Sequence, residues 1–177
     1  VSTVSVRVEN TAPDVSNVQI SSSSGFFYND EILTCSADVS DVDDNISATW
    51  YKWLLNGTSL APGNTLDLST VTVMPGDELI CRVESTDSLY LGDIDSATVT
   101  LSNRAPVLST VTIDNTTPYA DGTITCSVTV TDEDGEVLTP ILEWTNGTTV
   151  LGSTASITLT PSDAGVGDTI TCTASVE

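Results

Sequence analysis

The sequence predicts an all-β chain made of two tandem β-sandwich domains, and three observations support this. The length of 177 residues exceeds one small sandwich and suits two domains of about 90 residues each. β-Branched Val and Thr are frequent, and no window shows a sustained 3.6-residue periodicity, so we expect almost no helix. Finally, the Asn-Thr-Ala-Pro segment at residues 10–13 recurs as Asn-Arg-Ala-Pro at residues 103–106.

The internal repeat extends to three landmarks in each half of the chain. A cysteine is followed by a tryptophan 18 positions later and by a second cysteine 28 positions after that. Both halves keep these spacings, with Cys35, Trp53 and Cys81 in the first and Cys126, Trp144 and Cys172 in the second. Identical spacing of three landmarks indicates two copies of one structural unit.

Short strands with alternating apolar residues fill each half, as expected for half-buried strands. Asn56-Gly57 and Asn146-Gly147 follow the tryptophan strands and predict hairpin turns. The apolar positions of the predicted strands are Val18 and Ile20, then Leu33 to Val39, then Leu66, Leu68, Val71 and Val73, and finally Ala97, Val99 and Leu101, with counterparts at Val111 and Ile113, Ile124 to Val130, and Ile157 and Leu159.

The repeat also predicts the domain boundaries. Aligned on the Asn-x-Ala-Pro segments, Val4, Val6 and Val8 match the closing strand of the first domain, so we expect residues 1–9 to be the closing strand of a preceding or neighbouring domain. Residues 10–102 then form domain 1. Residues 103–177 form domain 2, which we expect to be without its own closing strand. That strand would come from adjoining sequence or, alternatively, from residues 1–9 of another copy.

Charge and cysteine content narrow the setting. Twenty-five acidic residues against four basic ones give a net charge of −21, which repels nucleic acid and anionic membranes. The chain has no transmembrane run, so we expect no membrane insertion of this segment. An even number of cysteines without zinc-site spacing favours an oxidising compartment, and hence an extracellular, cell-surface or secreted protein.

The order cysteine, tryptophan, cysteine on the second, third and sixth strands resembles the immunoglobulin fold. The resemblance implies two tandem immunoglobulin-like β-sandwich domains, with inter-sheet disulfides Cys35–Cys81 and Cys126–Cys172 and core tryptophans Trp53 and Trp144. The Asn-x-Ala-Pro segments and the Trp-then-Asn-Gly hairpins resemble the tandem immunoglobulin-like repeats of very large bacterial and archaeal surface proteins. This implies that the partners are neighbouring repeats or copies of the same chain.

Catalytic chemistry is poorly supported, and we expect no enzyme. The chain has no histidine, which removes the usual acid–base and triad arrangements. Only four cationic side chains are available for phosphate or oxyanion binding. No cofactor is required by any motif.

Calcium is the one cofactor that the sequence allows. The extended loop after each first cysteine strand places oxygen ligands at alternate positions, which resembles the start of a calcium loop. The loop that joins the sixth and seventh strands should lie beside it and contribute Asp87, Asp93 and Asp95. The alternative is that these residues simply form Asx turns. The candidate ligands are Asp41, Asp43, Asn45, Asp87, Asp132, Asp134 and Glu136.

Two other surface features are candidates for modification or binding. Asn-x-Ser/Thr sequons at Asn45, Asn56, Asn115 and Asn146 allow glycosylation, although asparagine also favours turns. Trp50 is out of phase with Trp53 and should point outward, where it could bind a ligand or pack under its own loop.

We therefore interpret the chain as a structural extracellular segment, a spacer, stalk or filament of a cell-surface protein. Two alternatives stay open. One is an adhesin that binds glycan or protein, for which an exposed cluster of Trp50, Phe26, Phe27 and Tyr28 would be evidence. The other is an accessory module of a secreted enzyme.

Overall fold

The computed structural model describes residues 1–43, 46–87 and 89–177. The chain divides into two compact units, unit 1 of residues Val1–Asn103 and unit 2 of residues Arg104–Glu177. Within the described residues the regular structure is β-strand, apart from one short 3₁₀ turn. In that part of the chain, no helix has the length and apolar character needed to cross a membrane.

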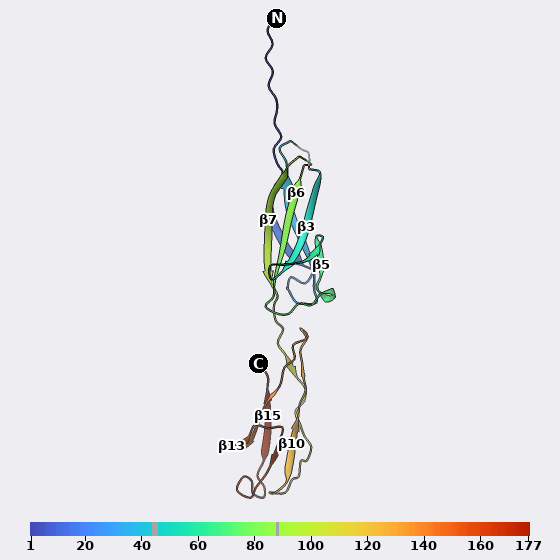
Figure 1. Cartoon of the computed structure of the whole chain (residues 1–177). Helices are drawn as coiled ribbons and strands as arrows, with labels where there is room; N and C mark the ends of the chain where they lie inside the picture. The colour runs from blue at the N-terminus through green and yellow to red at the C-terminus, as the bar shows by residue number, and fades with distance from the viewer. Residues whose placement is uncertain (44–45, 88) are drawn as a thin grey trace. The chain divides into compact units, whose positions relative to one another are not determined.

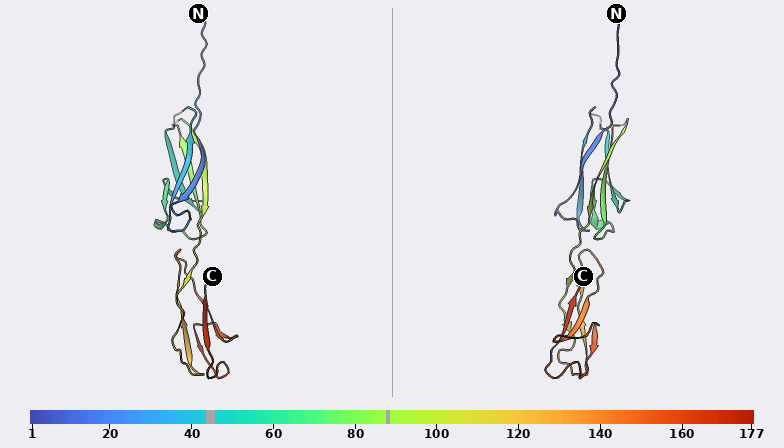
Figure 2. Two further views of the ribbon diagram at one scale, coloured as in Figure 1. Left: turned by 180° about the vertical axis from the view of Figure 1, so that it is seen from behind. Right: turned by 90° about the vertical axis from the view of Figure 1, so that its left-hand side faces the viewer.

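Unit 1 is a sandwich of antiparallel sheets (Figures 1 and 2). One sheet has the order β1–β2–β5, and the other has the order β4–β3–β6–β7. The right-hand view of Figure 2 shows these two layers of unit 1 facing each other. The strands are β1 Asp14–Ser22, β2 Ile32–Ser40, β3 Ala48–Leu55, β4 Thr58–Pro62, β5 Thr65–Asp67, β6 Glu78–Thr86 and β7 Leu91–Thr100.

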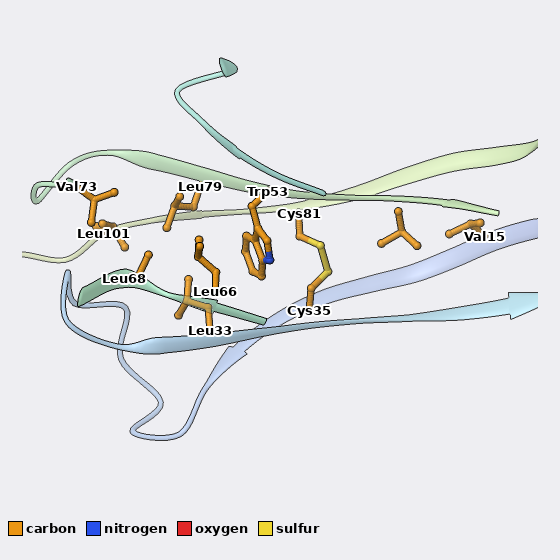
Figure 3. Close-up of a cluster of buried hydrophobic side chains, with 11 residues drawn as sticks. Val15, Leu33, Cys35, Trp53, Leu66, Leu68, Val73, Leu79, Cys81 and Leu101 are labelled. Carbon is orange, nitrogen blue, oxygen red and sulfur yellow. A yellow bond between two sulfur atoms is a disulfide. The ribbon is translucent and has the colours of Figure 1, made fainter. Parts of the chain in front are cut away.

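The core of unit 1 lies between these sheets and centres on a disulfide and a tryptophan (Figure 3). Cys35 on β2 is bonded to Cys81 on β6, so the disulfide joins the sheets. The Trp53 side chain packs beside it and is completely buried. Alternate residues of β2 and β6 point into this core because successive side chains of a strand face opposite ways.

Unit 2 repeats this plan with shorter strands. Its sheets have the orders β14–β10–β9, β11–β8 and β13–β12–β15. Cys126 on β10 is bonded to Cys172 on β15, beside the fully buried Trp144. The strands are β8 Val107–Leu108, β9 Thr112–Ile113, β10 Thr123–Ser127, β11 Val130–Thr131, β12 Ile141–Asn146, β13 Thr149–Gly152, β14 Ser156–Thr158 and β15 Ile170–Ser175.

The structure corrects two of the predicted strands. The predicted strand from Leu66 to Val73 ends after β5, and Leu68–Thr70 form a 3₁₀ turn, because the Asp67 side chain accepts a hydrogen bond from the backbone N of Ser69 at 3.0 Å. The predicted strand through Val128 and Val130 is divided into β10 and β11, which pair with different partners.

The division of the strands in unit 2 coincides with a change of residue in the first strand, four positions after the linker proline. In unit 1, β1 stays paired with β2 across a bulge at residues 16–19, where Asn17 adopts a left-handed φ of 52°. Asparagine tolerates that conformation, whereas β-branched residues rarely adopt it. The equivalent position, four residues after the linker proline, is Thr110 in unit 2, and the first strand there is divided into β8 and β9 on either side of it.

Candidate functional site

The Asn-Thr-Ala-Pro linker of unit 1 is bonded to two acidic loops of the same unit. Thr11 donates from its backbone N and from its Oγ1 to Asp43 Oδ2, at 2.7 and 2.8 Å. Asn10 donates from Nδ2 to Asp87 Oδ2. The linker thereby joins the loop between β2 and β3 to the loop between β6 and β7.

The proline of this linker packs against β7. Pro13 is buried, and its carbonyl oxygen accepts a hydrogen bond from the backbone N of Asp93 at 3.1 Å. Gly92 permits this approach, because a Cβ at that residue would lie only 2.4 Å from the Pro13 carbonyl oxygen. The linker is therefore part of the end of the sandwich.

Local turns orient the carboxylates that receive the linker. Asp41 accepts the backbone N–H of Asp43 on Oδ1 at 2.7 Å. Asp87 accepts the backbone N–H groups of Leu89 and Tyr90 on its own Oδ1, both at 2.7 Å. Such Asx hydrogen bonds hold a turn in one conformation, and they leave Oδ2 of Asp43 and of Asp87 facing the linker.

Unit 2 contains the same arrangement with a charged partner. The backbone N of Arg104 donates to Asp134 Oδ2, and its guanidinium contacts Asp134 Oδ1 through Nε at 3.0 Å and Nη2 at 2.8 Å. Nη2 also donates to the Glu133 carbonyl oxygen at 3.1 Å. Asp132 accepts the backbone N–H of Asp134 at 2.7 Å, as Asp41 does in unit 1. The Asp134 side chain is completely buried.

These two contacts occupy equivalent positions of the repeat. Asp43 and Asp134 each stand eight residues after the first cysteine of their unit, and Thr11 and Arg104 each fill the variable position of Asn-x-Ala-Pro. We name this contact between the variable linker residue and the loop aspartate the linker clasp. It attaches each linker to the unit that follows it in the chain.

Hydrogen bonding favours the ionised form of the unit 1 carboxylates. The pKa of Asp43 lies below its ordinary value because the backbone N–H of Thr11, and then its hydroxyl, donate to the carboxylate. The pKa of Asp87 is also lowered, first by the backbone N–H of Tyr90 and next by the side chain of Asn10. The bonds from the linker thus favour the ionised form of both carboxylates.

The structure places most of the predicted calcium ligands at the linker end of each unit. Oδ2 of Asp41 and Oδ2 of Asp132 are buried and have no hydrogen-bond partner among the described residues. Glu136 lies half-buried in the same loop as Asp132. Asn45 lies outside the described residues.

The described residues do not by themselves assemble a calcium shell. No group of three or more His, Cys, Asp and Glu side chains in that part of the chain is arranged to hold a metal ion. Asp43 and Asp134 direct oxygens at the linker, where a hydroxyl and a guanidinium, respectively, bind them. Calcium binding therefore stays a prediction.

Asp93 and Asp95 are not in the loop where the sequence places them. Both belong to β7, which begins at Leu91, because the hairpin from β6 is closed by the Asp87 turn and pairing resumes with Thr86 opposite Leu91. Of these three aspartates, Asp87 is the one whose side chain is bonded to the linker, whereas Asp93 contacts the linker through its backbone N–H.

The linker motif is visible in the sequence as a repeat landmark, but the roles of the clasp residues Thr11 and Arg104, and of Asn10 beside Asp87, were not predicted from it. The difference between Thr and Arg at one motif position gives no sign of a shared partner. The constant offset of an aspartate from the first cysteine is the signal that could have found it.

The sequon asparagines that the structure describes take part in turns. Asn56 has a left-handed φ of 48°, and its Nδ2 donates to Asp77 Oδ1 at 2.8 Å. Asn146 donates from Nδ2 to the Asp163 carbonyl oxygen and to Asp168, both at 2.8 Å. Asn115 accepts the backbone N–H of Thr117 at 3.0 Å. The fourth sequon, Asn45, is outside the described residues, and glycosylation stays a prediction.

The aromatic residues considered for binding do not form one cluster. Trp50 points outward and is 52% exposed, opposite Glu84 in the pairing of β3 with β6. Phe26 stacks on Tyr28, with ring centroids 5.4 Å apart, while Phe27 packs against the core. The Phe27 carbonyl accepts the backbone N–H of Ser102, which follows the Thr100 end of the β6–β7 ladder. Glu84, which pairs with Trp50, lies near the other end of that ladder, so Trp50 and Phe27 are at opposite ends of the unit.

Comparison with known proteins does not assign the chain to a family. No family model matches the chain, and no curated protein matches it. Among solved structures, the chain is similar to the three N-terminal domains of the bacteriophage RB49 highly immunogenic outer capsid protein, at 16% identity and a TM-score of 0.34. The match covers 93% of this chain and 58% of that one, so the chain spans less than two thirds of that structure. The fold assignment therefore rests on the strands and disulfides described above.

Proposed function

We propose that this chain is a structural spacer segment of an extracellular protein, in which clasped linkers join successive sandwiches with little freedom. The linker clasp is the observation that carries this proposal. It occurs at equivalent positions in both units, and each uses a loop carboxylate of the unit after the linker. The disulfides support an oxidising, extracellular setting.

The connection between the units supports a restricted joint. Ser102, in unit 1, donates its backbone N–H to the Phe27 carbonyl oxygen at 2.7 Å. Arg104, in unit 2, is bonded to Asp134 through its backbone and its side chain. Asn103 is the one residue between these two anchored positions. A connection of this length restricts the orientations that two units can adopt, whereas a long linker behaves as a random coil.

The clasp in unit 2 pairs a buried carboxylate with a cationic linker residue. A buried carboxylate needs a partner, because leaving it unpaired costs several kcal/mol, on the order of 3–5. Asp134 obtains that partner from the linker, since Arg104 contributes a backbone N–H and two guanidinium contacts. Folding of the acidic loop and ordering of the linker are therefore coupled.

The test is the rotational diffusion of each unit in the intact chain, measured by ¹⁵N relaxation and residual dipolar couplings. In the wild type we expect both units to share one alignment tensor and one overall tumbling time. Asp134→Asn should decouple them, because a neutral amide makes weaker hydrogen bonds to the guanidinium than an ionised carboxylate does. Dispersed amide signals from unit 2 verify that the variant is folded.

The matched control is Glu133→Gln. Glu133 also approaches Arg104, with its Oε2 3.5 Å from Nη1, but its side chain is 77% exposed. An exposed pair of this kind contributes little, so the control should tumble as the wild type does. Independent tumbling of the units in the wild type would contradict the proposal.

A further inference from the structure

The sheet of unit 1 that contains β3, β6 and β7 has an outer face that points away from the core. Figure 1 shows these three strands side by side. Trp53 and Cys81 lie opposite each other on the buried face, so the residues that alternate with them point outward. The outward residues of the three strands are Trp50, Lys52, Leu54, Ile80, Arg82, Glu84, Ile94, Ser96 and Thr98.

Two of the four basic residues of the chain are neighbours on this face. Lys52 and Arg82 lie directly opposite each other in the β3–β6 ladder, and like charges in such a pair destabilise a sheet. Arg82 is partly compensated, since its Nη2 lies 2.8 Å from Glu84 Oε1. Lys52 is exposed and forms no ion pair with any other described residue. The strand pairing therefore does not explain the charge of Lys52.

Exposed apolar side chains adjoin the two cations. In the neighbouring row of the sheet, Trp50 and Ile94 lie on either side of Glu84 and are 52% and 46% exposed. Apolar side chains with a polar surround mark surfaces that bind other proteins, and Trp and Arg dominate the binding energy of such surfaces. The outer face of unit 1 therefore has the composition of an interface.

The internal repeat places a face of opposite charge on unit 2. Three positions before the core tryptophan, unit 1 has Trp50 and unit 2 has Ile141, which is 57% exposed. One position before it, unit 1 has Lys52 and unit 2 has the exposed Glu143. The apolar position is thus kept while the charge is inverted. The outward residues of this face in unit 2 are Ile141, Glu143, Thr145, Val150, Thr171, Thr173 and Ser175.

Charge limits which surfaces of two copies can meet, because each copy has a net charge of −21. Two outer faces of unit 1 would bring the cations Lys52 and Arg82 together, and two outer faces of unit 2 would bring Glu143 against itself. The outer face of unit 1 against that of unit 2 instead pairs opposite charges, which favours association and excludes the other pairings.

We propose that the outer face of unit 1 docks on the outer face of unit 2 of a second copy. The two sheets pack face to face, as sheets do in a sandwich. Trp50 packs against Ile141 and Val150, while Lys52 and Arg82 pair with Glu143. The inference goes beyond the proposed spacer function, because it concerns contact between copies and not the joint within one chain.

The test is self-association of the 177-residue chain, followed by sedimentation velocity and by NMR chemical shifts over a concentration series. At about 0.15 M NaCl the Debye length is about 8 Å, which screens the overall repulsion more than the pairs in contact. We expect association that rises with concentration, with shifts of the Trp50 indole N–H and of the β12 amides. Trp50→Ala should weaken the association constant about 10-fold.

A mixture of two charge variants tests which faces meet. Lys52→Glu and Glu143→Lys should each weaken self-association about 10-fold, because each brings like charges into the contact. Lys52→Glu keeps the outer face of unit 2, and Glu143→Lys keeps that of unit 1. An equimolar mixture should therefore associate more strongly than either variant alone. A mixture no stronger than its components would overturn the proposal.

The matched controls make the same charge changes outside the two faces. Arg7→Glu alters the net charge as Lys52→Glu does, and its side chain is 86% exposed. Asp121→Lys alters it as Glu143→Lys does, in an exposed turn before β10. Each control should change the association constant by less than about 3-fold. Equal effects of controls and face variants would show general charge repulsion and contradict the docking of these faces.

Two other results would also overturn the proposal. One is a wild-type chain that stays monomeric at millimolar concentration, which would leave the outer face of unit 1 to an acidic partner of another kind. The other is a Trp50 environment that Glu143→Lys changes equally at every concentration, which would identify a contact within one molecule. Neither result affects the proposed spacer function, because the joint is measured on dilute monomer through Asp134→Asn.

Discussion

Thr11 and Arg104 solve the same problem with different chemistry. Asp43 is partly accessible to water, and the hydroxyl and backbone N–H of Thr11 satisfy the carboxylate oxygen that faces the linker. Asp134 is buried, and a neutral hydroxyl would leave its charge uncompensated, so the arginine supplies both donors and charge. In these two units, the buried aspartate meets a charged linker residue and the partly accessible one meets a neutral linker residue.

The lowered carboxyl pKa values predict how unit 1 responds to acid. Asp43 and Asp87 have folded-state pKa values below the ordinary value of 3.8. Their stabilisation is therefore complete above that value and is lost as pH falls through the lower folded-state values. The melting temperature of unit 1 should be constant near neutral pH and decrease below about pH 4.

Thermal melting from about pH 7 to pH 2, followed by tryptophan fluorescence, checks this prediction. Asp43→Asn should melt at a lower temperature at neutral pH and lose less on acidification. A variant with the same acid response as the wild type would show that the clasp carboxylate does not contribute. The pKa of Asp168 in unit 2 is lowered chiefly by the backbone N–H of Gly165, so unit 2 should respond with the same sign.

At the scale of elements, the two units differ in how completely their strands are paired. In unit 1, β6 is paired along most of its length with both β3 and β7. In unit 2, β15 is paired with β12, and the first strand is divided into short pieces. Unit 2 also has the smaller cluster of fully buried apolar residues among those described. Its disulfide should therefore account for a larger share of its stability.

Removal of each disulfide tests this expectation. Both bonds link residues that are 46 positions apart, for which the chain-entropy model gives about 4 kcal/mol. The double substitution Cys126→Ala with Cys172→Ala should leave unit 2 largely unfolded, whereas Cys35→Ala with Cys81→Ala should leave a folded but weakened unit 1. Urea unfolding followed by amide signals of each unit distinguishes these outcomes. Equal loss of structure in both variants would contradict the expected difference.

At the scale of the whole molecule, the net charge of −21 governs interaction with ions. Charge of this size disfavours the compact state through self-repulsion, and any salt reduces that repulsion. A specific calcium site has to be separated from this general effect. The Oδ2 atoms of Asp41 and Asp132 are the candidate contacts for a cation, because they are buried and have no hydrogen-bond partner among the described residues.

The calcium prediction is checked by melting the chain in millimolar CaCl₂, in excess chelator and in NaCl of equal ionic strength. Binding to the folded state alone should raise the melting temperature in calcium above that in NaCl. Asp41→Asn and Asp132→Asn should remove this difference in their own units. Equal melting temperatures in the two salts would contradict a specific site.

The sequence by itself determined the all-β class and the repeat. Alternating apolar residues and Asn-Gly turns are local signals, because strand periodicity and turn conformation depend on near neighbours. The spacing of cysteine and tryptophan landmarks, through the immunoglobulin resemblance, also identified both disulfides and the buried Trp53 and Trp144. Local signals failed where a side chain redirected the backbone, as Asp67 does at the end of β5.

The tertiary structure alone decided which carboxylates face a linker. Asp43 and Thr11 are 32 residues apart, Asp134 and Arg104 are 30 apart, and Asp87 and Asn10 are 77 apart. No local pattern encodes such pairs, since they meet only after both sheets have packed and brought the loops to one end. The same reason explains why Asp93 and Asp95, assigned to a loop from composition, lie in β7: the register of β7 against β6 is set by the buried face of the sheet, on which Ala97 and Val99 lie opposite Cys81 and Leu79.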